Sequence, residues 1–120
     1  MRRILWLVFA MAAALGAADA SGKWSGNVTA PGGELTTAYF ELRQSGEDLS
    51  GTAGPSAGRQ FPIRKARIQG SKLTFEVAMP DGATMKFGLV LEAERMQGEM
   101  TREKSGEGEE TSRILVRRAA

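Results

Sequence analysis

Acid–base chemistry is the first function to consider, because carboxylates are the side chains of this chain that most often carry it. The sequence has 120 residues and contains no cysteine and no histidine. That composition removes thiolate nucleophiles, imidazole bases and the usual zinc ligands. A pair of carboxylates could still act as in a glycosidase, and the candidates are Glu41, Glu76, Glu92 and Glu99. Because these residues alternate with apolar neighbours, we expect them to point outward, which argues against an enzyme.

Other chemical motifs are weak. Four acidic residues gather in a glycine-containing segment, namely Glu103, Glu107, Glu109 and Glu110. Calcium prefers several oxygen ligands, but no calcium-loop spacing is present here, so we expect a solvated loop without metal. Arg113, Arg117 and Arg118 are too few for a polybasic lipid anchor. With no phosphate-binding loop, dinucleotide fingerprint or nucleophile elbow, the sequence predicts a non-enzymatic protein without a cofactor.

The first twenty residues have the three-part layout of a secretory signal peptide. Two arginines precede an apolar run over Ile4–Leu15, and small residues then end in Ala18-Asp19-Ala20. The apolar run is too short to span a membrane as a helix. We expect cleavage after Ala20 or, as the second choice, after Ala18. Residues 21–120 then form a single domain that is secreted or periplasmic.

The composition of residues 21–120 excludes two kinds of partner. This part of the chain has 14 basic and 13 acidic residues, whereas a nucleic-acid-binding domain is expected to carry a basic stripe. Outer-membrane barrels have strands of about 9–11 residues and girdles of aromatic side chains. The strands expected here are shorter, and the chain ends in Arg-Arg-Ala-Ala. We therefore expect no nucleic-acid partner and no membrane insertion after cleavage.

Short alternating runs, broken by Gly, Pro, Asp and Ser, dominate the sequence after the leader. Every second residue is apolar along Lys72–Met79, and Thr84–Leu91 repeats the pattern. This period of two is typical of half-buried strands, and no stretch has the period of a helix. The alternation changes phase between Ile63 and Ala66, which predicts a β-bulge. The predicted strands are 23–29, 38–43, 49–53, 61–69, 72–79, 84–91, 96–101 and 112–117.

Eight strands at this spacing favour a sandwich or a barrel. Tight joins are predicted at 46–48, 70–71 and 92–94, and longer ones at 30–35, 54–60, 80–83 and 103–111. In an up-and-down meander, alternate loops lie at the same end, so one end has the tight turns and the other the long loops. Closing the sheet also removes the edge strands, which are prone to aggregation. We therefore predict an all-β protein, an antiparallel meander of about eight strands closed as a small barrel.

The start of the first strand carries a family resemblance. Gly22-Lys23-Trp24 resembles the G-x-W of calycins, the superfamily of lipocalins, avidins and fatty-acid-binding proteins, and Trp24-Ser25-Gly26-Asn27 is similar to the avidin opening. The resemblance implies a barrel closed at one end by Trp24, with an arginine laid over the indole ring. Arg117 or Arg118 could take this part, and Arg117 is our assignment. It also implies that a ligand enters on the long-loop side. The whole chain further resembles small exported β-domains of unknown role from soil bacteria.

The barrel interior separates two functions. Residues 21–120 include 34 hydrophobic residues, ten of them alanine, which leaves 24 large side chains. About that number would fill an eight-strand barrel. A filled interior predicts a structural or protein-interaction domain, whereas a cavity of about 300 Å³ or more predicts a module that binds a small apolar molecule. The expected lining of such a pocket is Tyr39, Phe40, Phe61, Met85 and Phe87. Three methionines would either make the pocket adaptable or fill the core, namely Met79, Met96 and Met100.

Overall fold

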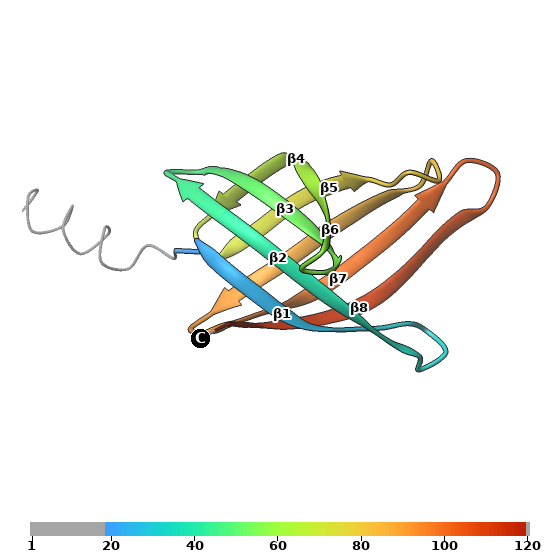
Figure 1. Ribbon diagram of the computed structural model, residues 1–120, viewed down its shortest axis with the longest axis horizontal. Helices are drawn as coiled ribbons and strands as arrows, with labels where there is room; N and C mark the ends of the chain where they lie inside the picture. The colour runs from blue at the N-terminus through green and yellow to red at the C-terminus, as the bar shows by residue number, and fades with distance from the viewer. Residues whose placement is uncertain (1–18, 120) are drawn as a thin grey trace, which may run out of the picture.

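In the described part of the chain, eight antiparallel strands form a closed barrel in which each strand pairs with its neighbours in the sequence (Figure 1). The computed structural model describes residues 19–119, so the predicted leader up to Ala18 lies outside the described residues. The last strand pairs with the first, with Trp24 opposite Arg118 and Thr29 opposite Arg113, and this pairing closes the sheet. The strands are β1 (Gly22–Thr29), β2 (Leu35–Ser45), β3 (Asp48–Ser56), β4 (Arg59–Gln69), β5 (Lys72–Ala78), β6 (Thr84–Glu92), β7 (Arg95–Lys104) and β8 (Gly108–Arg118).

The predicted meander is confirmed, and alternation explains why these residues form strands. In β5, Leu73, Phe75 and Val77 are buried, while Lys72 and Thr74 are exposed. A strand with one apolar face is stable only when that face is covered, and closing the barrel covers it on every strand at once. Each of the eight predicted strands has its counterpart in the structure.

The predicted bulge in β4 is also confirmed. Its register with β5 shifts between Arg64 and Arg67, and Lys65, which lies between them, has a positive φ of 52°. One extra residue on a strand turns the side chains that follow to the opposite face. The shift therefore explains why the apolar phase of the sequence changes between Ile63 and Ala66.

The three tight turns lie at one end of the barrel, which we call the tight-turn end. Ser45 pairs with Asp48 and Gln69 with Lys72, so that two residues make each of these turns. Their first residues, Gly46 and Gly70, have φ values of 64° and 62°. Two-residue hairpin turns require a positive φ at this position, which glycine adopts at little cost.

Ala93 occupies the same position in the third tight turn, with φ of 56°. A side chain in this left-handed conformation costs about 1 kcal/mol, and glycine avoids this cost. Glycine also gives the unfolded chain more conformational freedom, which offsets part of the gain. We expect Ala93→Gly to raise the free energy of unfolding by about 0.5 kcal/mol and Ala93→Val to lower it. Urea unfolding of the two variants beside the parent protein measures both changes. A loss of stability in the glycine variant would contradict this account of the turn.

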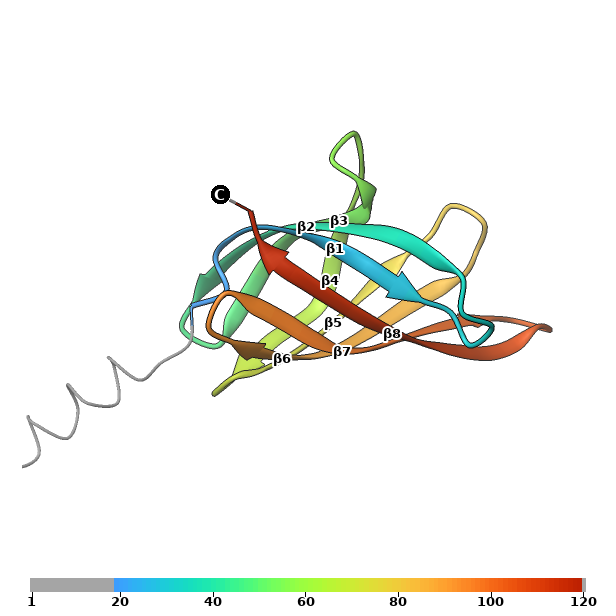
Figure 2. The ribbon, with the colours of Figure 1, turned by 90° about the horizontal axis from the view of Figure 1, so that it is seen from below.

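The predicted loops 103–111 and 54–60 are wrong in extent. Strands β7 and β8 stay paired as far as Lys104 and Gly108, and β3 and β4 stay paired as far as Ser56 and Arg59. Figure 2 shows these two hairpins reaching past the barrel wall. Outside the barrel both faces of a strand meet water, so its residues are polar on both faces and the apolar alternation used for prediction disappears.

Candidate functional site

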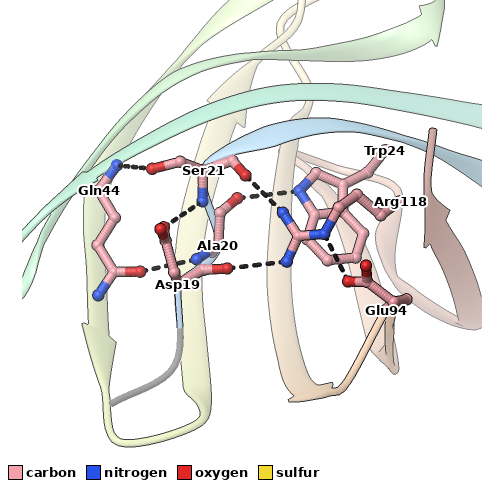
Figure 3. Close-up of polar contacts among 7 residues, drawn as sticks. All are labelled: Asp19, Ala20, Ser21, Trp24, Gln44, Glu94 and Arg118. Atoms are coloured by element: carbon pink, nitrogen blue, oxygen red, sulfur yellow. Dashed lines mark hydrogen bonds and ion pairs between the residues drawn. The ribbon is translucent and has the colours of Figure 1, made fainter. Parts of the chain in front are cut away.

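The tight-turn end is closed by Trp24, whose side chain is fully buried. The guanidinium carbon of Arg118 lies 4.4 Å from the centre of the indole ring, within the range of a cation–π contact. The indole nitrogen donates a hydrogen bond of 2.9 Å to the carbonyl oxygen of Ala20 (Figure 3). Trp24 is therefore covered on its ring face and satisfied at its polar atom.

The assignment of Arg117 to this position is wrong, because Arg118 occupies it. Ile114 and Val116 of β8 are buried, so alternation directs Arg118 to the same inner side and Arg117 to the exposed outer wall. The register agrees, since Trp24 pairs with Arg118 and Ser25 pairs with Arg117. The phase of Ile114 and Val116 was the sequence signal that distinguishes the two arginines.

An apolar cavity of about 280 Å³ lies inside the other end of the barrel, which we call the long-loop end. Its floor includes Phe40 and Phe87, whose rings lie 5.5 Å apart in an edge-to-face arrangement. Phe75 supports this floor by stacking on Phe87 at 4.7 Å. Together these three rings separate the cavity from the packed tight-turn end. The lining residues are Val28, Thr36, Thr37, Ala38, Phe40, Ala53, Gly54, Pro55, Val77, Met79, Met85, Phe87 and Met100.

Three of the five predicted pocket residues line this cavity, namely Phe40, Met85 and Phe87. Tyr39 does not, because Phe40 beside it is buried in the barrel and alternation places Tyr39 on the outer wall. Phe61 on β4 does not line it either, although it is partly buried and packs against the core. The structure therefore brings together only part of the predicted set.

The predicted methionines separate into two groups. Met79 and Met100 line the cavity beside Met85, so three thioether side chains from β6, β7 and the end of β5 share its wall. Met96 is fully buried and lies outside the lining, where it pairs in register with Leu91 and Val116 near the tight turns. Flexible thioethers adjust to irregular shapes, so this part of the wall can change its form at little cost.

Small residues on neighbouring strands account for the hollow, and sequence reasoning missed them. Ala38 on β2 and Ala53 on β3 line the cavity, and Gly26 on β1 pairs with Ala38. A Cβ atom at Gly26 would collide with the carbonyl oxygen of Leu115 on β8. At these positions the wall formed by β1, β2 and β3 therefore contributes little volume, while Met85, Phe87 and Met100 project from the wall that faces it.

Charged side chains near the long-loop end neutralise one another. Arg102 donates to the carboxylate of Asp81 at 3.0 Å and lies 3.6 Å from that of Glu107. Lys104 lies 3.4 Å from the second oxygen of Glu107. These charges are paired and the lining below them is apolar. A molecule in the cavity would therefore make mainly apolar contacts and experience little electrostatic attraction.

Titration of Asp81 is predicted to make the stability of the fold depend on pH. Hydrogen bonds from the Ala83 amide and the Arg102 guanidinium, both 3.0 Å, hold the pKa of the Asp81 carboxyl below its ordinary value. A carboxyl whose pKa is lower in the folded than in the unfolded protein stabilises the fold when the pH is above its unfolded pKa. This contribution to stability is lost as the pH falls through its folded pKa. We expect an NMR titration to place the Asp81 pKa below that of an unfolded peptide. In Asp81→Asn, the acid-induced loss of stability should be smaller.

The candidate acid–base residues lie on the outer wall, away from the cavity. Glu41 lies 3.8 Å from Lys23, Glu76 lies 3.6 Å from Arg64, and Glu92 lies 3.7 Å from Arg95. Glu99 is exposed on β7. Among residues 19–119, no group of three acidic side chains is arranged to hold a metal ion. These carboxylates thus occur singly in surface ion pairs or in water, a setting in which they contribute little to stability.

Comparisons with known proteins leave the function to be argued from this geometry. No model of a protein family matches the chain, and no curated protein matches it. Within the described part of the chain, no helix has the length and apolar character needed to cross a membrane.

Proposed function

We propose that this protein is an exported, non-enzymatic barrel that binds a small apolar molecule in the cavity at its long-loop end. The observation that carries the proposal is the cavity itself, about 280 Å³ in volume and lined almost entirely by apolar side chains. Unfilled volume costs stability, because the apolar side chains that line it lack the contacts that they would have in a packed core. Occupancy by an apolar ligand would recover those contacts.

The cavity also limits the class of ligand. Its volume of about 280 Å³ lies just below the value of about 300 Å³ at which ligand pockets usually begin, so the ligand is small. Thr36 and Thr37 are the lining residues with hydroxyl groups, and the Thr37 hydroxyl already donates to the carbonyl of Pro55 at 2.6 Å. Four charged residues near the long-loop end are paired with one another, namely Asp81, Arg102, Lys104 and Glu107. An uncharged ligand, mostly hydrocarbon and with at most one polar group, fits these constraints.

We propose that this arrangement is a calycin-type barrel. Trp24 near the start of β1, an arginine of the last strand over its indole ring, and a cavity at the opposite end match what the G-x-W resemblance implies. The proposal that the protein is exported rests on the signal-peptide pattern of the first twenty residues. An exported protein would bind its ligand in the periplasm or the medium.

The proposal is tested on protein exported by a bacterial host from the full-length precursor. Native mass spectrometry after gentle purification would detect a retained small molecule. Titration with the uncharged dye N-phenyl-1-naphthylamine would then measure binding at the cavity, with a rise in fluorescence that saturates at one dye per chain. The absence of both a retained ligand and saturable dye binding would contradict the proposal. That result would favour the alternative, a structural or protein-interaction domain.

A further inference from the structure

Two peptide bonds at the end of the leader satisfy the small-x-small pattern of signal-peptidase sites. Gly16-Ala17-Ala18 precedes one bond and Ala18-Asp19-Ala20 precedes the other. Cleavage at the first bond leaves Asp19 and Ala20 on the exported protein, and cleavage at the second removes them. Local sequence ranks the second bond first, so the choice depends on what these two residues do in the folded barrel.

Ala20 is a buried part of the fold. Its side chain is fully buried, and it belongs to the core cluster that contains Trp24. Its carbonyl oxygen accepts the hydrogen bond from the Trp24 indole nitrogen at 2.9 Å, and its amide donates to the side-chain oxygen of Gln44 at 2.8 Å. Loss of Ala20 would uncover the indole and remove the acceptor of its buried N–H, which is a costly change.

Asp19 extends the same network to the last strand. Its carbonyl oxygen accepts a hydrogen bond of 2.9 Å from Arg118, and its carboxylate accepts one of 2.9 Å from the amide of Ser21 (Figure 3). Arg118 also donates to the carbonyl of Ser21 and to the carboxylate of Glu94. The segment before β1 is therefore bound both to the arginine that covers Trp24 and to Gln44 on β2.

The charge of a new amino terminus favours the same bond. Cleavage after Ala20 would place an ammonium group on Ser21, whose carbonyl is already held by the positive guanidinium of Arg118, and the two like charges would repel. Cleavage after Ala18 would place the ammonium group on Asp19, which is exposed and carries its own carboxylate. The Asp19 carbonyl also accepts a hydrogen bond from Arg118, so both termini would lie near this guanidinium. The terminus created after Ala18, however, keeps Ala20 and also keeps the Asp19 carboxylate, whose negative charge offsets the repulsion.

We propose that signal peptidase cuts between Ala18 and Asp19, so that the exported protein begins with Asp19 and uses Asp19–Ala20 as the plug over Trp24. In this hydrolysis, water adds across the peptide bond, with hydroxyl to the Ala18 carbonyl carbon and a proton to the Asp19 nitrogen. The inference rests on the proposed export of the protein. It changes the predicted start of the domain from Ser21 to Asp19.

The test begins with the full precursor expressed in a bacterium that exports it. Intact mass and amino-terminal sequencing of the exported product distinguish the two cuts, which differ by one aspartate and one alanine. We expect a product that starts at Asp19. A wild-type product that starts at Ser21 would overturn the proposal, and so would a precursor that stays uncut.

A variant of the leader supplies the second measurement. Gly16→Leu places a large residue at the −3 position of the proposed cut and leaves Ala18-Asp19-Ala20 intact, while Gly16→Ala keeps a small residue there as the matched control. We expect the control to be processed like the parent. The leucine variant should accumulate as precursor or give a product from Ser21 that melts about 5–15 °C lower.

Failures of the two proposals are distinguishable. A leucine variant still cut before Asp19, or a Ser21 product that melts like the parent, would overturn the assigned cut and the plug. Dye binding by either product reports on the cavity alone, because the cavity lies at the opposite end of the barrel from Trp24. A precursor that is never exported would overturn both the cut and the export part of the proposed function.

Discussion

Replacing Trp24 with alanine is expected to lower the free energy of unfolding by about 3–5 kcal/mol. The side chain is fully buried at the tight-turn end, with Arg118 over its ring and Ala20 bonded to its indole nitrogen. The substitution removes the apolar contacts of the largest buried side chain, leaves a hollow at the barrel end and takes the donor away from the Ala20 carbonyl. A small domain without disulfides has few other sources of stability with which to offset this loss.

Urea unfolding followed by far-ultraviolet circular dichroism measures the effect, because the variant lacks the tryptophan that a fluorescence assay would use. Trp24→Phe is the matched variant, since it keeps most of the apolar contact and removes the indole N–H. It should lose about 1–3 kcal/mol, between the parent and the alanine variant. If the alanine variant unfolds outright, the phenylalanine variant still carries the test. A loss well under 1 kcal/mol for alanine would mean that Trp24 does not close the barrel.

Filling the cavity from its thin wall is expected to weaken dye binding strongly. Ala38 lines the cavity on β2, beside Gly26, which has no side chain. The phenyl group of Ala38→Phe would therefore project into the space that the ligand is proposed to occupy. We expect affinity for N-phenyl-1-naphthylamine to fall at least about tenfold, because the apolar contacts of the dye with the floor are replaced by those of the new ring.

The matched control is Ala78→Phe, which introduces the same side chain at an exposed position on β5. We expect this control to bind dye like the parent protein. Thermal unfolding adds an independent readout. A phenyl group placed in a real cavity costs little, whereas one forced into a packed core costs about 1–3 kcal/mol. Unchanged dye binding by Ala38→Phe, or a loss shared by Ala78→Phe, would contradict the proposed site.

The two ends of the barrel differ in how they are packed. The tight-turn end, with Trp24, Met96 and Val116, is filled and supplies the stability of the fold. The long-loop end has the cavity and the hairpins that reach past the wall. Under the proposed function, a ligand would enter or leave without opening the packed half.

The strand order and the meander were predictable because the alternation that encodes them is local. Leu73, Phe75 and Val77 specify the inner face of β5 from within the strand itself, and the phase change near Lys65 marked the bulge. The same local signal separates Arg118 from Arg117 once Ile114 and Val116 are placed inside. It also separates Phe40 from Tyr39, which the predicted pocket had grouped together.

The sequence by itself determined the number and order of the strands, where the chain turns tightly and which face of each strand is apolar inside the barrel, since each depends on neighbours a few residues apart. Only the tertiary structure decided whether the interior is full. That depends on Gly26, Ala38 and Ala53 meeting on adjacent strands, and on the register between β1 and β8 that sets Arg118 over Trp24. Both are contacts between residues far apart in the chain, and the volume left inside a barrel is a property of all eight strands together.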